Sequence, residues 1–166
     1  MICKFDIEQF IDIDYATDIR KDRRKNNKEG KSTAEFFTPY SIVLRMCDKV
    51  EPEIWADPTK TFLESSFGNG QFILMILYRR IYEYNIPWKT ALETVFGVEL
   101  MQDNVAETKQ RVHELLRNIS PDYDPDEANR IMDKNLVCHD FFTWNFEEWR
   151  PYTDEELKKL KIKKRK

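Results

Sequence analysis

Three short apolar runs divide the middle of the chain, at residues 61–64, 95–99 and 136–140. Runs of this length, bounded by turn residues, are typical of buried strands. The segments between them carry apolar residues at helical spacing, over 71–84, 88–94, 101–117 and 126–134. The alternation of strand and helix predicts an α/β protein, with a parallel sheet, right-handed crossovers and flanking helices.

Further elements are predicted outside this alternation. Thr38 before Pro39 is a good N-cap followed by a good first helical residue. It predicts a helix to about residue 50 whose apolar face holds Ile42, Val43, Met46 and Val50. Residues 51–60 contain two prolines and predict turns, while residues 5–20 favour a helix. Thr153 and Glu156 form a capping box that opens a last helix.

Length and composition predict a globular chain. It has 166 residues, of which 41% are hydrophobic, and its longest apolar run has seven residues, where a membrane span needs roughly 20. The N-terminus has no basic-then-apolar leader, and three scattered cysteines show no metal-binding spacing. We therefore expect a cytoplasmic protein with no metal and no membrane partner. The expected division is a helical and basic segment 1–33, a main domain 34–152 and a basic helix or tail 153–166.

The net charge of −3 hides two cationic segments. Residues 20–31 carry a local charge of +5 and residues 158–166 carry +7, which leaves −15 on the rest of the chain. An acidic body with two such segments can attach to a polyanion through them. The alternative is that both segments are solvated, and charge alone does not decide between the two.

Each predicted strand ends in a carboxylate: Glu64, Glu99 and Asp140. In a parallel α/β sheet, ligands bind at the carboxyl ends of the strands. Gly68 and Gly70 lie in the loop after the first strand, but a third glycine that a dinucleotide loop needs is missing. Carboxylates attract a cationic ligand and accept hydrogen bonds from hydroxyls and amines. S-adenosylmethionine, with a cationic amino-acid end, a ribose and an adenine, meets these conditions.

Four short sequence motifs support this hypothesis. They are Phe36-Phe37-Thr38-Pro39, Phe62-Leu63-Glu64-Ser65-Ser66-Phe67-Gly68-Asn69-Gly70-Gln71-Phe72, Phe96-Gly97-Val98-Glu99-Leu100 and His139-Asp140-Phe141-Phe142. In this order they resemble the cofactor half of adenine-N6 DNA methyltransferases, of the kind found in type I restriction-modification methylase subunits. The resemblance covers roughly residues 34–144. It implies a Rossmann-like, S-adenosylmethionine-dependent methyltransferase fold with a partial parallel sheet.

The resemblance also implies a role for each matching residue. Thr38 would contact the methionine carboxylate of the cofactor, and Glu64 would face its amino group. Ser66 and Gly68 would shape the loop around the methionine moiety. Around the nucleoside, Glu99 would hold the ribose hydroxyls and Asp140 would accept from the adenine amine, with Leu100 and Phe141 against the ring.

One motif of that family is missing. Its members carry Asn, Asp or Ser, then two prolines and an aromatic residue, at the end of a fourth strand, where the motif binds the target base. After Asp140 the chain offers only Trp149-Arg150-Pro151-Tyr152, so Tyr152 keeps the aromatic ring without the acceptor. The sequence resembles a methylase that stops before this motif.

Two main functions remain open at this point, and a third, a small-molecule methyltransferase, is disfavoured because Phe37-Thr38-Pro39 resembles the DNA enzymes specifically. The first is a DNA adenine-N6 methyltransferase-like protein that binds S-adenosylmethionine and DNA and takes its catalytic motif and target recognition from a second chain. The second is a non-catalytic decoy, regulatory or nucleic-acid-binding protein of a restriction-modification system. The four motifs of the cofactor half favour the first function, and the missing target-base motif favours the second.

Overall fold

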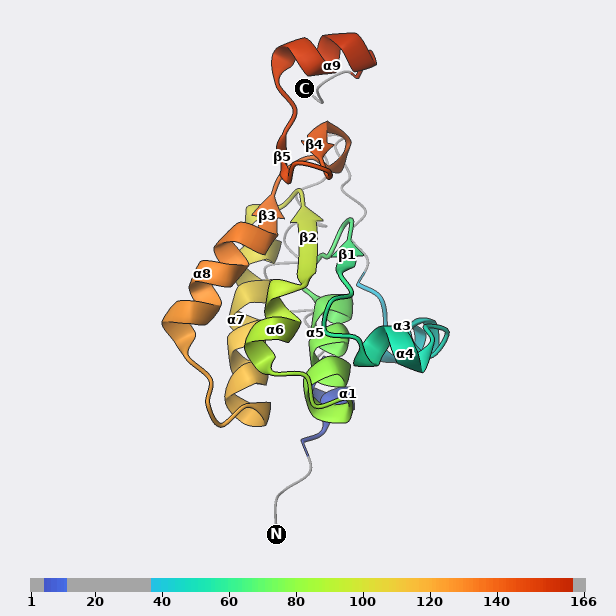
Figure 1. The fold of residues 1–166 in the computed structure, drawn as a ribbon, viewed down its shortest axis with the longest axis vertical. Helices are drawn as coiled ribbons and strands as arrows, with labels where there is room; N and C mark the ends of the chain where they lie inside the picture. Colours follow the sequence, from blue (N-terminus) through green and yellow to red (C-terminus); the bar gives the residue numbers. More distant parts are fainter. Residues whose placement is uncertain (1–4, 12–36, 163–166) are drawn as a thin grey trace, which may run out of the picture.

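The fold is built on a parallel sheet of three strands (Figure 1). In the computed structural model, residues 5–11 and 37–162 are described. Strands β1 (Phe62–Glu64), β2 (Val95–Glu99) and β3 (Leu136–Cys138) lie in the order β1-β2-β3, both pairs parallel. The predicted α/β class, parallel sheet and flanking helices are therefore confirmed. Among the described strands the order shows no reversal, so β1 lies at one edge of this sheet.

Four helices connect the strands and contact β2. They are α5 (Gln71–Tyr78), α6 (Trp88–Glu93), α7 (Gln102–Ile119) and α8 (Pro125–Asn135), and a π-helical segment, η2 (Arg79–Glu83), continues α5. Seven of the eight side chains of α5 are buried, and its apolar residues belong to one cluster with those of α7 and α8. This cluster is the hydrophobic core. Its fully buried members include Ile73, Leu74, Leu77, Leu92, Val112, Leu115, Leu116 and Met132.

The helices before the sheet differ from the predictions in detail. α3 (Tyr40–Cys47) begins after Pro39, which is its N-cap, and no side chain caps it, so the prediction that Thr38 caps this helix is wrong. α3 packs on α5 through Val43 and Cys47, whereas Ile42 and Met46 are 46% and 53% exposed. The predicted apolar face is confirmed for Val43 and Val50, which pack in or against the core, and is wrong for Ile42 and Met46, because only one narrow side of α3 meets the core.

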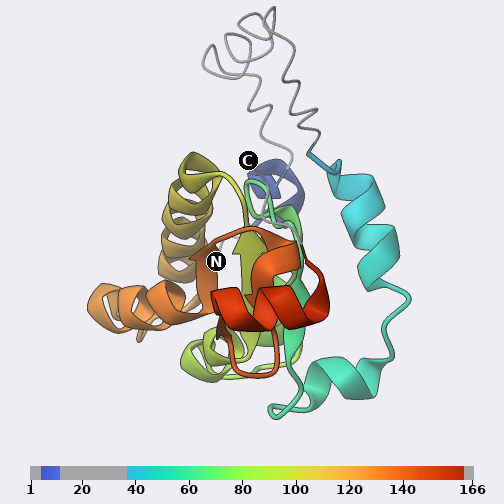
Figure 2. The ribbon, with the colours of Figure 1, turned by 90° about the horizontal axis from the view of Figure 1, so that it is seen from above.

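Two more segments complete this part of the chain. The turns predicted for residues 51–60 contain a helix, α4 (Pro52–Ala56), which starts at a proline and buries Trp55. α1 (Ile7–Ile11) lies within the predicted helix 5–20, and the rest of that prediction falls outside the described residues, as do the cationic segment 20–31 and residues 163–166. Figure 2 shows α3 and α4 to one side of the sheet.

After β3 the chain forms a small unit above the carboxyl ends of the strands (Figures 1 and 2). A 3-10 turn, η3 (Phe141–Thr143), leads to an antiparallel pair, β4 (Trp144–Asn145) and β5 (Arg150–Pro151). The helix α9 (Asp154–Leu160) follows, opened by the predicted capping box of Thr153 and Glu156. We call residues 141–160 the cap. In chain order it follows β3, where members of the resembled family have a fourth strand that is not predicted for this sequence.

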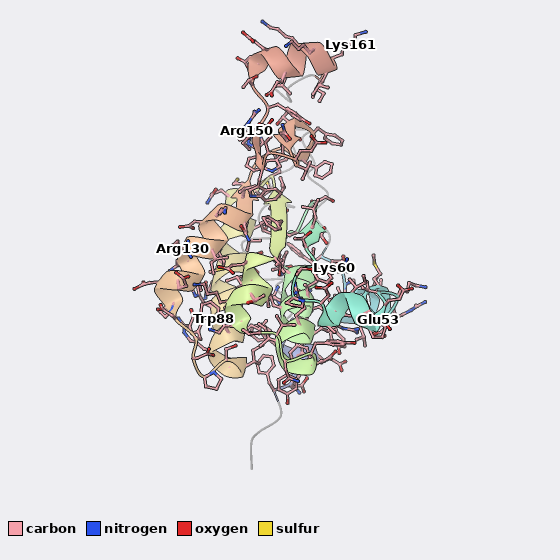
Figure 3. All side chains as sticks on the ribbon, viewed as in Figure 1. Glu53, Lys60, Trp88, Arg130, Arg150 and Lys161 are labelled. Carbon is pink, nitrogen blue, oxygen red and sulfur yellow. The ribbon has the colours of Figure 1, made fainter. Side chains whose placement is uncertain are left out.

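Trp149 attaches the cap to the rest of the molecule, and Arg150 joins two elements within the cap. The Trp149 indole donates to the Lys134 carbonyl at 2.7 Å, and its ring meets the Phe96 ring of β2 edge-on, 4.8 Å between centroids. Arg150, which is labelled in Figure 3, lies on β5. It forms a two-pronged ion pair with Glu156, at 2.8 and 2.9 Å, which joins β5 to α9. None of the described helices is long and apolar enough to cross a membrane.

Candidate functional site at the carboxyl ends of the strands

The loop after β1, residues 65–70, has a shape that requires glycine. Gly68 and Gly70 adopt positive φ angles of 52° and 90°, which side chains disfavour. A Cβ on Gly68 would lie 3.1 Å from the Phe37 ring, and one on Gly70 would lie 2.7 Å from the Thr108 methyl group. The Thr108 hydroxyl also donates to the Gly68 carbonyl at 3.0 Å. The loop is therefore clamped between α7 and the segment that leads into α3.

Glu99, at the end of β2, holds this loop from below. Its Oε2 accepts from the Gly68 amide at 2.8 Å and its Oε1 from the Met101 amide at 2.9 Å. The residue is only 5% exposed. Two of the predicted ligand residues, Glu99 and Gly68, are thus bonded directly to each other, although they are 31 positions apart in the chain.

Glu64, at the end of β1, lies at the start of the same loop. Its Oε1 accepts from the Ser66 amide at 3.3 Å. Burial raises the pKa of the Glu64 carboxyl above its ordinary value and the nearby Glu99 carboxylate adds to this, while the Ser65 and Ser66 amides oppose it. Two acidic groups are therefore held close together at the carboxyl ends of neighbouring strands.

A cavity of about 350 Å³ opens above these strand ends. It collects residues that follow all three strands: Ser65, Ser66, Leu100, His139, Asp140, Phe141 and Phe142. Four of the eight predicted cofactor-binding residues, namely Ser66, Leu100, Asp140 and Phe141, therefore line one cavity. The other four are Thr38, Glu64, Gly68 and Glu99, and they lie around or beneath the loop rather than in the cavity wall.

Asp140 and Phe141 turn the chain from β3 into the cap. β3 ends at Cys138, two residues earlier than predicted, and the Asp140 carboxylate accepts from the Phe142 amide at 3.0 Å, so that it caps the 3-10 turn. Phe141 rests against Phe146 with ring centroids 4.7 Å apart. Leu100 is 47% exposed at the mouth. These apolar groups give the cavity a wall against which a flat ring can lie.

A second cavity of about 310 Å³ lies on the other side of the same wall. Leu100, His139 and Asp140 border both cavities, and the second is completed by residues of the cap, Thr143, Pro151, Tyr152 and Leu157. Tyr152 is held by its amide, which donates to the Thr143 carbonyl at 3.0 Å. This predicted catalytic candidate therefore lines the second cavity and not the first.

Thr38 is connected to the loop through its backbone. Its carbonyl accepts from the Gln71 side-chain amide at 3.3 Å, and Gln71 is the first residue of α5. The half-buried Thr38 lines neither of the two cavities. The segment carrying Thr38 therefore lies next to the loop, but Thr38 itself is not among the residues that line the cavities.

His139, Phe142 and Leu157 also line the cavities, although no ligand role was predicted for them. His139 borders both cavities, and its Nε2 lies 3.1 Å from the Thr143 hydroxyl. Its position beside Asp140 was the available signal, because residues that follow a strand end share its neighbourhood. Leu157 gave no comparable signal, since a helix in the cap brings it to the cavity from 57 residues beyond Leu100.

The charge of the site is negative. Asp140 borders both cavities, Glu64 and Glu99 lie around and beneath the loop beside them, and no described residue of either wall is a lysine or an arginine. Such a field favours a cationic ligand and opposes a phosphate group. Among residues 5–11 and 37–162, no three histidine, cysteine or acidic side chains are grouped in a way that could hold a metal ion.

Comparison with known proteins gives no relative for this chain. No protein-family model matches it, and searches of curated proteins and of solved structures find no significant match.

Proposed function

We propose that the chain is an S-adenosylmethionine-binding, Rossmann-like domain of the DNA adenine-N6 methyltransferase type. The observation that carries the proposal is the acidic cavity lined by Ser66, Leu100, Asp140 and Phe141 at the ends of three parallel strands. Hydroxyls, a carboxylate and an aromatic ring are the groups that a cationic nucleoside requires. A mononucleotide or dinucleotide phosphate is a poor fit to the same wall, because none of the described residues that line it is basic.

The hydrogen-bond acceptors near the cavities suit this cofactor. Glu99 is buried beneath the loop and outside both cavity walls, where it accepts two backbone amides. A carboxylate offers about four lone-pair positions, and the remaining ones would accept from ribose hydroxyls. Asp140 would accept from the adenine amine, with Leu100 and Phe141 beside the ring. Glu64 would face the amino group of the methionine end, and Ser66, Gly68 and Thr38 would surround that end.

The chemistry that the cofactor supplies is a methyl group on a positively charged sulfur. The work of this chain is to bind and orient it and to exclude water, because methyl transfer depends mainly on alignment. After β3 the described chain forms the cap instead of a strand bearing the acceptor motif. We therefore propose that a second chain supplies the groups that hold the target amine, with DNA as the substrate and the cytoplasm as the location.

Calorimetric titration with S-adenosylmethionine and S-adenosylhomocysteine tests the proposal directly. We expect micromolar binding of both, and no binding of ATP. Glu99→Ala and Asp140→Ala should each weaken binding by roughly 1.5–3 kcal/mol, as expected for a lost charge-assisted hydrogen bond. Asp133→Ala is the control, because Asp133 pairs with Lys109 on α8 and α7, away from the cavities. Unchanged affinity in both site variants would contradict the assignment.

A non-catalytic DNA-binding function is the second candidate. Lys158, Lys159 and Lys161 give the end of α9 a positive charge, and the acceptor motif of the methyltransferases is missing. This candidate predicts binding to DNA that weakens steeply with salt and disappears when residues 158–166 are removed, together with no affinity for S-adenosylmethionine. The two titrations therefore separate the candidates.

A further inference from the structure

We propose that Arg111 is a positioning residue of this site, which holds the loop 65–70, the Thr38 segment and α1 in one arrangement. As a consequence, docking of α1 and binding of a ligand at the loop strengthen each other. The ligand part of this inference rests on the proposed function, whereas the positioning part does not.

Arg111 lies on α7 and is 1% exposed, directly behind the loop. Its Nη1 donates to the Asn69 carbonyl at 2.7 Å and to the Gln71 side-chain oxygen at 3.0 Å. A guanidinium is planar and presents its donors in a rigid fork, so these two bonds fix the loop and the first turn of α5 relative to α7.

The chain of contacts continues from Gln71 to Thr38. While its oxygen accepts from Arg111, the Gln71 side-chain nitrogen donates to the Thr38 carbonyl at 3.3 Å. Gln71 is itself buried. Orientation of this one amide therefore transmits the position of Arg111 to the segment that precedes α3.

The second nitrogen of Arg111 points to the N-terminal helix. Nη2 donates to the carbonyls of Phe10 and Ile11, at 3.2 and 3.3 Å, and the guanidinium stands 5.9 Å from the centre of the Phe10 ring. These carbonyls end α1, where a cation is favoured by the helix dipole. Ile11 is fully buried in the core beside them.

One side chain thus joins segments that are about 100 residues apart in the chain. If α1 undocks, Arg111 loses two of its acceptors, and the arrangement that it imposes on Asn69 and Gln71 is weakened. Coupling of this kind is reciprocal, so a ligand that orders the loop also favours docking of α1.

Arg80 offers a matched control. It is 0% exposed, donates to the carbonyls of Lys60 and Asp57, and stands 5.2 Å from the Phe62 ring centre. It therefore resembles Arg111 in burial and bonding but anchors the chain before β1, away from the loop. Arg111→Lys and Arg80→Lys both keep the charge and lose the fork.

Hydrogen exchange of the full-length chain, with β2 amides as the internal reference, is the first measurement. Arg111→Lys should speed exchange in residues 5–11 and in residues 66–71 by about tenfold or more, as expected from lost hydrogen bonds to a charged group. Arg80→Lys should leave both segments unchanged relative to β2. Acceleration in only one segment, or equal acceleration by both variants, would overturn the proposal.

Gln71→Met provides a second variant if Arg111→Lys does not fold. It should speed exchange at residues 38–43 and leave residues 5–11 protected, because it removes the Gln71 bonds to Arg111 and Thr38 but keeps the bonds of Arg111 to Asn69, Phe10 and Ile11. Acceleration at residues 5–11 in this variant would overturn the proposed order of contacts.

Titration with S-adenosylmethionine is the third measurement. The ligand should slow exchange in residues 5–11 of the wild type, and Arg111→Lys should bind about tenfold more weakly than Arg80→Lys. Equal affinities would overturn the coupling. A wild-type chain that binds no S-adenosylmethionine would overturn the proposed function instead, and the exchange pattern would still decide the positioning role.

Discussion

The described residues before the cap, 5–11 and 37–140, form the body of the molecule, and the body and the cap are stabilised in different ways. In the body, α5, α7 and α8 share one cluster of buried apolar side chains, and two buried arginines bond to backbone carbonyls. The cap buries Trp144 and Leu157, and neither belongs to that cluster. Contacts between aromatic rings and the ion pairs of Arg150 hold the cap together internally. Trp149 joins it to the body through the Phe96 ring and the Lys134 carbonyl.

This difference gives the body and the cap different roles in a binding site. Burial of apolar area is the largest stabilising contribution in a protein, whereas exposed ion pairs contribute little. The body can therefore hold Glu64, Glu99 and the glycine loop in fixed positions. The cap, which closes one side of the second cavity, can open at low cost, as regions near binding sites commonly do.

The largest expected effect contrasts two leucines. Leu115→Ala in α7 should reduce the free energy of unfolding by about 2–5 kcal/mol, because it empties a fully buried position. Leu157→Ala in the cap should reduce it by less than about 1 kcal/mol, because the cap can detach while the body stays folded. Urea denaturation measures both. Equal losses of unfolding free energy would show that the cap and the body unfold as one unit, and the proposed contrast between them would be wrong.

A smaller effect is expected where the sheet meets the loop. A Cβ on Gly97 would lie 2.5 Å from the Phe67 ring, so Gly97→Ala should cost about 1–3 kcal/mol through overpacking. Phe67→Leu should recover part of this loss in the double variant, which a double-mutant cycle on unfolding free energies would reveal. Strict additivity of the two substitutions would contradict the steric explanation.

Trp149→Phe tests the attachment of the cap alone. It removes the indole hydrogen bond to the Lys134 carbonyl and keeps an aromatic ring against Phe96. The cost should be about 0.5–1.5 kcal/mol, confined to opening of the cap. Hydrogen exchange should accelerate in residues 144–157 and remain unchanged in β2. Acceleration in β2 as well would place Trp149 in the cooperative core.

The smallest effect concerns Glu64. Because burial raises the pKa of its carboxyl, the folded state binds this proton more tightly than the unfolded state does. The stability that the protonated group contributes is full below the ordinary glutamate value and is lost as pH rises through the raised pKa. Glu64→Gln should therefore raise the melting temperature slightly at pH 7 and have no such effect near pH 3, by calorimetry. A gain that is the same at both pH values would exclude ionisation as its cause.

Much of the body could be predicted from the sequence. β1, β2, the start of β3 and the helices between them follow from local patterns, because each buries a continuous apolar run against the same core. The acidic residue that ends each apolar run also predicted the positions of Glu64 and Glu99 at strand ends. Local periodicity failed at α3, where Ile42 and Met46 form an apolar row that the core does not meet.

The cap and the buried polar contacts could not be predicted in the same way. The hairpin of β4 and β5 is held by the rings of Phe96 and Trp149, which are 53 positions apart in the chain. Arg111 is part of an amphipathic helix whose other arginine, Arg117, is exposed, and no pattern in the sequence distinguishes the two. The roles implied for Thr38 and Tyr152 by the family resemblance remain predictions.

The strand order has a consequence for synthesis of the protein. Each strand pairs with the strand made just before it, so the sheet can grow outward on the ribosome without waiting for a distant segment. β1 pairs with β2 once residue 99 has emerged, and β3 adds after residue 138. The second cavity depends on Leu157 and is completed last, so a nascent chain acquires its scaffold well before it can enclose a molecule there.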